Sequence, residues 1–192
     1  ISECLVGSEM CIRDRDKAHF STLLRMKEMN MRFVSLTFHT DQLSAVLVIH
    51  MVCEKILETW IEASSHNKNF FNNSVSLTFN NKLIIAKNFS FPNECFQFMK
   101  KLNAIRNKFA HQIDKTEMTE EEINSLYNSL SEFIAREPEF DPKTSSIESR
   151  KKRYKYTDNN NIKLLLLFTA MYLSVMYFAG LRELYIPLGE KP

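Results

Sequence analysis

Glycine and proline are scarce in this chain, which has only three glycines and five prolines among 192 residues. So few turn-forming residues argue against an all-β fold rich in loops and favour helices. A charge of one sign is also lacking, because the net charge is only +2. General nucleic-acid binders carry a larger basic excess, so any contact with RNA would have to come from a local basic patch.

Motifs for metals and cofactors are missing as well. The four cysteines, Cys4, Cys11, Cys53 and Cys95, form no CxxC pair and lack the spacing of zinc ligands. We therefore expect a reducing compartment and no metal. The sequence has no Walker loop, dinucleotide fingerprint, HExxH motif or nucleophile elbow, so we expect no cofactor. It also shows no secretory signal, and we expect a cytoplasmic location.

The first fifteen residues, ISECLVGSEMCIRDR, resemble a translated read-through of a sequencing adapter. We expect residues 1–15 to be non-native or disordered, with the natural start lost or near Met26. The length of the remaining chain fits one domain with a hydrophobic core. We expect a single helical domain over residues 16–185 and a tail over residues 186–192.

The spacing of apolar residues predicts helices along most of the chain. The expected helices cover residues 18–37, 41–65, 81–87, 93–110, 119–137 and 162–185. Thr40 or Asp41 offers an N-cap for the second of these helices, and Thr119 and Glu122 have the spacing of a capping box. Residues 141–161 read as a polar linker. The sequence thus predicts an all-α bundle of about five helices.

The last helix raises the question of a membrane span. The segment that starts at Leu164 and ends at Leu181 has no charged side chain and is just long enough to cross a bilayer. The basic block before it would then act as a cytoplasmic flank. However, Lys163 and Arg182 bound it closely, and a bundle needs a closing helix to cover its other apolar faces. We expect a core helix, with a membrane span as the alternative.

The stretch KLNAIRNKFAHQ carries the candidate site, with Arg106 and Asn107 at the edge of an apolar stripe and His111 near the expected helix end. On one straight helix, Arg106 and His111 are about 140° apart around the axis and about 7.5 Å apart along it. They converge only if the helix end unwinds or if two copies of the helix meet at a two-fold axis. Alternatively, Arg106 pairs with Glu54 or Glu58, and His111 caps helix carbonyls.

The motif RNKFAH resembles the signature of the HEPN superfamily, in which an arginine and a polar residue are followed by a histidine. The longer pattern, LTFNNKLIIAKN with FMKKLNAIRNKFAH, is similar to the mannitol-repressor-like branch, and the resemblance covers roughly residues 41–112. It implies a helical bundle that dimerises and, in many members, acts as a metal-independent endoribonuclease. A toxin or phage-defence effector restrained by a partner fits this reading. A non-catalytic dimeric regulator or adaptor is the alternative.

The resemblance also implies roles for the candidate residues. His111 would take the proton of an RNA 2′-hydroxyl, and Arg106 would hold the phosphate oxygens in a bidentate fork. Asn107 would orient the phosphate or His111. Independently of the resemblance, the spacing of His50 and Glu54, one turn apart on the preceding helix, suggests a pair that orients Arg106 across the bundle. Alternatively, they form a structural hydrogen bond in the core.

The basic block RKKRYK provides a second candidate for RNA contact. The candidate residues for binding the RNA backbone are Arg150, Lys151, Lys152, Arg153 and Lys155. Tyr154 or Tyr156 could stack on a base, whereas the alternative is a solvated loop. The expected partners are therefore a second copy of the chain, an RNA substrate, and a protein antitoxin or regulator.

Overall fold

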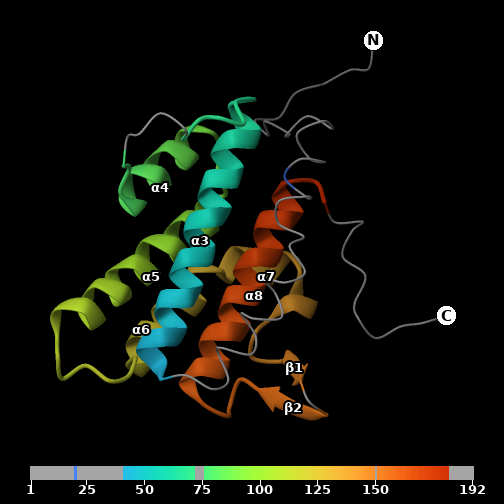
Figure 1. Cartoon of the computed structure of the whole chain (residues 1–192). Helices are drawn as coiled ribbons and strands as arrows, with labels where there is room; N and C mark the ends of the chain where they lie inside the picture. The colour runs from blue at the N-terminus through green and yellow to red at the C-terminus, as the bar shows by residue number, and fades with distance from the viewer. Residues whose placement is uncertain (1–19, 21–40, 72–75, 150, 182–192) are drawn as a thin grey trace.

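The computed structural model describes residue 20 and residues 41–71, 76–149 and 151–181 (Figure 1). Its elements are α3 (Gln42–Ser64), α4 (Phe79–Asn88), α5 (Asn93–His111), α6 (Glu120–Ser129), α7 (Ser131–Arg136), the 3₁₀ helix η1 (Pro138–Phe140), β1 (Ser146–Ser149), β2 (Lys152–Lys155) and α8 (Asn160–Phe178). Six α-helices in this part of the chain confirm the predicted all-α bundle.

Several predictions fall on residues outside this description. They are the helix at residues 18–37, the segment at residues 1–15 and the tail at residues 186–192. Phe20 is the one described residue among them. Its ring is buried and meets the ring of Trp60 edge to face, with centroids 5.7 Å apart.

Side-chain caps start the helices where the sequence offers them. Of the two N-caps expected for α3, the structure uses Asp41, whose Oδ1 accepts the N–H of Ser44 at 3.0 Å. The capping box of α6 is confirmed, since Thr119 Oγ1 accepts the N–H of Glu122 at 3.2 Å. The carboxylate of Glu122 accepts the N–H of Thr119 at 3.0 Å in return. These caps satisfy backbone donors that have no partner inside the helix.

A glycine in the left-handed region ends α8. Gly180 has a φ of 70°, and its N–H donates to the carbonyl of Tyr177. The N–H of Leu181 donates to the carbonyl of Met176 at 3.0 Å. This pair of bonds is a Schellman motif, and the position favours glycine because a Cβ would clash there.

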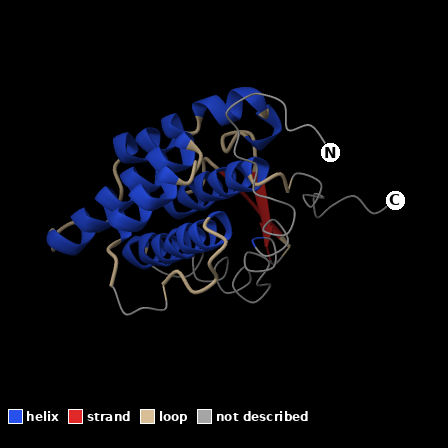
Figure 2. Ribbon diagram, turned by 90° about the horizontal axis from the view of Figure 1, so that it is seen from above, coloured by secondary structure: helices blue, strands red, loops and turns tan. Residues whose placement is uncertain are grey.

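Helix α5 lies at the centre of the bundle and packs against α3, α4, α6, α7 and α8. Phe98, Met99 and Leu102, which are among its fully buried side chains, continue the core that Ile49 and Cys53 form on α3. Seen from above, the helices form one bundle, and the two strands lie at its edge (Figure 2). The core therefore lies on one face of α5 and leaves the opposite face available for polar side chains.

Two expectations about the chain after α5 were wrong. The helix expected at residues 119–137 is broken at Leu130, which has a φ of −100° and a ψ of 4° and separates α6 from α7. The expected linker contains an antiparallel hairpin, in which Ile147 pairs with Tyr154. Ile147 packs against the core, and this anchors a segment whose other side chains are mostly polar. One inward-facing apolar position was too weak a pattern to be read as a strand.

Helix α8 is the one described helix that is long and apolar enough to cross a membrane, judged by length and composition. However, 61% of its most apolar 18-residue window is buried inside the protein. The helix packs against α3, α5 and α6, and Leu164, Leu167 and Met171 are fully buried. These contacts favour the expected core helix over the membrane span.

Candidate functional site

Helix α5 carries Arg106 and His111 on different faces. The helix continues regularly to His111, and the N–H of Gln112 still donates to the carbonyl of Lys108 at 2.9 Å. The helix end therefore does not unwind. Arg106 is half-buried and His111 is exposed, and helix geometry keeps them about 140° apart. One chain does not bring the two together, which leaves the arrangement across a two-fold axis as the prediction.

Asn107 is the hydrogen-bond partner of Arg106 among the described residues. Arg106 Nη1 donates to Asn107 Oδ1 at 3.1 Å, whereas Arg106 Nε is buried and has no hydrogen-bond partner. The described part of the chain shows no ion pair to Arg106. Its guanidinium is thus held by one neutral amide on the same helix and is not neutralised by a carboxylate there.

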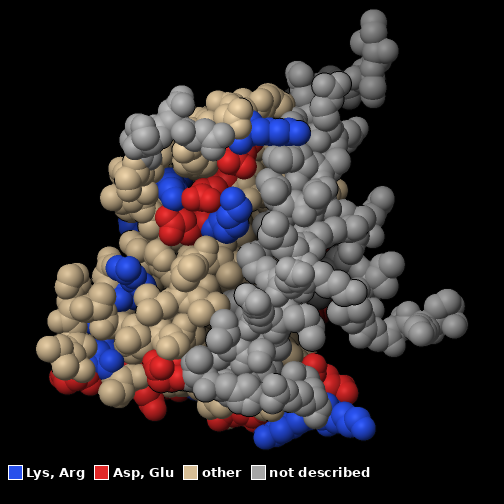
Figure 3. Space-filling view, in the orientation of Figure 1, with Lys and Arg blue, Asp and Glu red and all other residues tan. Residues whose placement is uncertain are grey.

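Lys82 of α4 holds the two carboxylates that could have paired with Arg106. Its Nζ lies 2.7 Å from Glu54 Oε1 and 2.7 Å from Glu58 Oε1. The alternative interpretation, in which Arg106 pairs with one of these glutamates, is therefore wrong. Figure 3 shows acidic and basic side chains gathered in one patch over α3 and α4.

The ionisation of this cluster follows from its close contacts. Burial raises the pKa of Glu58, but the hydrogen bond and charge of Lys82 outweigh it, so the pKa lies below its usual value. Burial lowers the pKa of Lys82, but the bonds to Glu54 and Glu58 outweigh it, and the pKa is raised. Glu58 and Lys82 therefore stay ionised near neutral pH.

His50 of α3 lies against α5 and supports it. Its Nε2 lies 2.9 Å from Asn103 Oδ1, and its ring packs at a tilt of 33° against the Phe79 ring, with centroids 4.1 Å apart. Burial lowers the pKa of His50; the bond to Asn103 opposes this shift, and the charge of Arg106 adds to it. His50 is therefore neutral near pH 7. The expected hydrogen bond between His50 and Glu54 does not form, because His50 bonds to Asn103 and Glu54 bonds to Lys82.

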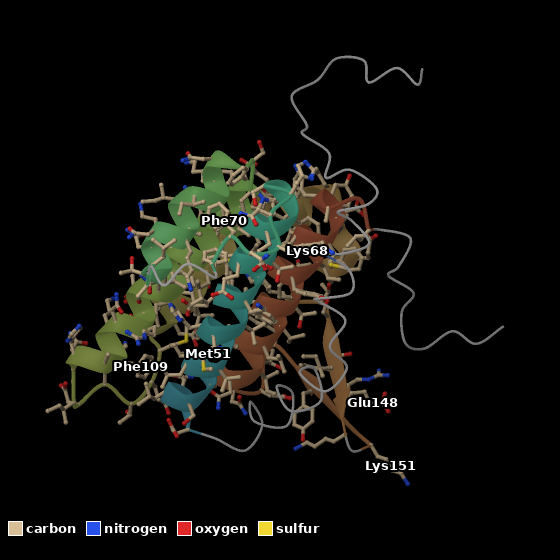
Figure 4. The ribbon with its side chains drawn as sticks, turned by 45° about the horizontal axis from the view of Figure 1, so that its top comes forward. Met51, Lys68, Phe70, Phe109, Glu148 and Lys151 are labelled. Atoms are coloured by element: carbon tan, nitrogen blue, oxygen red, sulfur yellow. The ribbon has the colours of Figure 1, made fainter. Side chains whose placement is uncertain are left out.

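The basic block forms the tip and second strand of the hairpin. Lys151, Lys152, Arg153 and Lys155 are exposed, and Arg150 lies outside the described residues. The Nζ of Lys152 lies 5.0 Å from the centre of the Tyr154 ring. Figure 4 shows Glu148 and Lys151 far from Phe109 of α5, so the structure does not bring this basic tip beside the Arg106 motif.

Tyr156 is a poor candidate for stacking on a base. Its ring packs against the core, and its hydroxyl is buried without a hydrogen-bond partner. Burial raises the pKa of Tyr156 to about 12. Of the two tyrosines considered, Tyr154 on β2 is the one that remains on the hairpin surface.

The cysteines do not indicate a reactive site. Cys53 and Cys95 are free thiols, both fully buried, and burial raises the pKa of each. Buried, protonated thiols are weak nucleophiles. Within the described residues, no group of three or more His, Cys, Asp or Glu side chains could hold a metal ion.

Two residues of this region were missed by sequence reasoning. Asn103 lies one turn before Arg106 and Asn107, so its place on the same helix face follows from the spacing. Its role as the partner of His50 depends on how α3 packs against α5. Lys82 is a single lysine within the apolar run KLIIA, but its choice of Glu54 and Glu58 depends on how α4 packs against α3.

Comparison of the chain with models of known protein families, with curated proteins and with solved structures gives no match.

Proposed function

We propose that this chain is a metal-independent endoribonuclease of the HEPN type that works as a homodimer in the cytoplasm. A toxin or phage-defence effector restrained by a protein antitoxin or regulator is the biological role that fits such an activity. The observation that carries the proposal is that no carboxylate of the described residues pairs with the guanidinium of Arg106. Arg106 is half-buried on α5, its guanidinium bonds to the neutral amide of Asn107, and Lys82 holds Glu54 and Glu58, the two carboxylates expected as alternative partners.

An arginine in this state suits a phosphate ligand. Guanidinium stays charged at any physiological pH, and its planar N–H groups match two oxygens of a phosphate. A partly dry surrounding strengthens that attraction relative to water. A buried Nε–H without a partner adds a donor that a ligand could satisfy if the side chain turns outward.

His111 supplies the acid–base chemistry in this proposal. A neutral imidazole can accept a proton from a hydroxyl and pass it on, which is why histidine is the commonest general base in proteins. It would take the proton of a 2′-hydroxyl, the 2′-oxygen would attack phosphorus, and the bond to the 5′-oxygen would break. The proton returns to that 5′-oxygen. The products are a 2′,3′-cyclic phosphate and a 5′-hydroxyl, and no co-reactant is consumed.

A second chain is required because of the helix geometry. Arg106 and His111 lie about 140° apart around α5, so one RNA phosphate cannot contact both in one chain. A two-fold axis beside α5 would place His111 of one protomer near Arg106 of its partner. Exposed Met51 and Leu43 on α3 offer apolar surface for such a contact.

Purified protein incubated with RNA in the presence of EDTA tests the activity. We expect cleavage products with cyclic phosphate ends, and a rate loss of about 10²- to 10⁴-fold in His111→Ala. Arg106→Ala should lose activity similarly. His66→Asn, at an exposed histidine just after α3, is the control, because the φ of 54° at this position disfavours alanine. Cleavage that survives both substitutions in α5 would refute the proposal.

A non-catalytic dimeric regulator or adaptor is the second candidate. The separation of Arg106 and His111 within one chain favours it, because a regulator needs no convergence of the two. In that case no RNA is cut under any condition. Arg106→Ala would then affect only dimerisation or the binding of a protein partner.

A further inference from the structure

On the polar face of α5 next to His50, the side-chain acceptors are already hydrogen-bonded, whereas, within the part of the chain that the structure describes, N–H donors remain free to bind a ligand. Asn103, Arg106 and Asn107 have the i, i+3 and i+4 spacing of neighbours on one helix face. Both asparagine side-chain oxygens are already engaged: Asn103 Oδ1 by His50 and Asn107 Oδ1 by Arg106. The direction in which each amide points is therefore fixed by its partner.

The consequence for Asn103 follows from the shape of an amide. Its oxygen and its nitrogen lie on opposite sides of the same carbon, and only the nitrogen carries protons. His50 Nε2 must carry a proton to donate to Asn103 Oδ1. With the oxygen turned toward His50, the two N–H groups of Asn103 Nδ2 are directed away from it. Neither they nor those of Asn107 Nδ2 have a hydrogen-bond partner in the described part of the chain.

His50 is itself held in place, so it can fix this orientation. It is 8% exposed, and its ring packs against that of Phe79 at the start of α4. Its neighbours with charge are Arg106 and Glu54, and Glu54 is engaged by Lys82. The imidazole on α3 is thus held by contacts with both α4 and α5.

We propose that Asn103 is a third ligand-contacting residue of the Arg106 site, that His50 is the residue that positions it, and that the ligand is a backbone phosphodiester of RNA. Asn103, Arg106 and Asn107 together offer only N–H donors, which match the oxygens of an anion. The substrate class rests on the proposed ribonuclease function, whereas the donor arrangement does not.

Binding of an uncleavable probe tests this site separately from catalysis. The probe is a short 2′-O-methyl oligoribonucleotide, which keeps every phosphate but lacks the attacking hydroxyl. Asn103→Leu removes one donor and should weaken binding by about tenfold. Asn103→Asp should weaken it further, because it replaces the donor by a carboxylate. Asn124→Asp, on an exposed part of α6, makes the same charge change and should stay within about twofold.

The positioning role of His50 has its own pair of variants. His50→Phe keeps the ring packing on Phe79 but removes the donor, so Asn103 can flip and binding should fall about as much as in Asn103→Leu. His50→Gln keeps a side-chain N–H and should bind as the wild-type protein does. Thermal unfolding of each variant confirms that it is folded. Equal losses in His50→Gln and His50→Phe would overturn the positioning role.

The remaining outcomes separate this inference from the proposed function. Unchanged binding in Asn103→Leu overturns the inference, even if the wild-type protein cuts RNA. Binding that depends on Asn103, in a protein that cuts no RNA, keeps the site and rejects the ribonuclease. Inorganic phosphate should compete only weakly with the probe. If it binds as tightly as the probe, the ligand is a free phosphate and the proposed phosphodiester is wrong.

Discussion

Lys82→Met is expected to destabilise the fold by leaving two glutamates without their cation. The side chain of Lys82 is 11% exposed, and those of Glu54 and Glu58 are 33% and 23% exposed. Breaking a buried ion pair costs about 3–5 kcal/mol, whereas an exposed pair contributes about 1 kcal/mol or less. This cluster lies between the two cases, so we expect a loss of about 2 kcal/mol. For a chain of this length the midpoint of thermal unfolding falls by about 4–8 °C.

The control for Lys82→Met is Lys55→Met. Lys55 contacts the same Glu58 at 3.3 Å, but its side chain is 43% exposed. Its loss should change the free energy of unfolding by about 0.5 kcal/mol or less. The triple variant Lys82→Met, Glu54→Gln, Glu58→Gln should recover much of the stability, because no unpaired charge remains.

The stability that this cluster provides should also depend on pH in a defined way. Glu58 has a lowered pKa in the folded chain, so its contribution is present above about pH 4.5 and is lost as the pH falls through the folded value. Urea denaturation of wild type and Lys82→Met should therefore converge in acid. A single variant as stable as wild type at pH 7, or a triple variant no more stable than the single one, would refute the stabilising role of the Lys82 cluster.

Three further substitutions test other parts of the structure. Burial lowers the pKa of His50, and the charge of Arg106 acts in the same direction. As the pH falls below about 6.5, His50 is therefore protonated in the unfolded chain before it is protonated in the folded one, and the folded state loses stability. His50→Gln should flatten the loss of stability between about pH 7 and 5, and an unchanged slope in urea denaturation contradicts this. Leu167→Ala, in the buried face of α8, should cost about 2–5 kcal/mol if α8 is a core helix; a value like that of Met51→Ala, at a largely exposed site, would speak for a lipid-facing helix. Thr119→Ala should cost about 1 kcal/mol through the lost cap, measured against Thr116→Ala as an exposed control.

The helices of this protein could be predicted because their signals are local. Asp41 and Thr119 each act on backbone groups within a few residues, and the structure uses both. Gly180 is an equally local signal, but the helix expected over residues 162–185 ran past it, whereas α8 ends at Phe178. The hairpin could not be predicted in the same way. Its pairing depends on Ile147 reaching the core, and that contact is invisible without the surrounding helices.

The candidate site was predictable only in its residues on α5. The spacing of Arg106 and His111 already indicated that one regular helix keeps them apart, and α5 is regular to its end. The partners of those residues depended on packing between helices. Because α4 and α5 both lie against α3, Glu54 pairs with Lys82 and not with Arg106. For the same reason His50 bonds to Asn103 and not to Glu54.

The most direct test of the central claim is RNA cleavage by a mixture of two inactive variants. Arg106→Ala and His111→Ala protomers are purified separately, mixed, and allowed to exchange subunits. If the site combines Arg106 of one protomer with His111 of its partner, mixed dimers contain one intact site, and about one quarter of wild-type activity should return. If the mixture stays as inactive as each variant alone while the wild-type protein cuts RNA, the site is not shared between protomers and the account is contradicted.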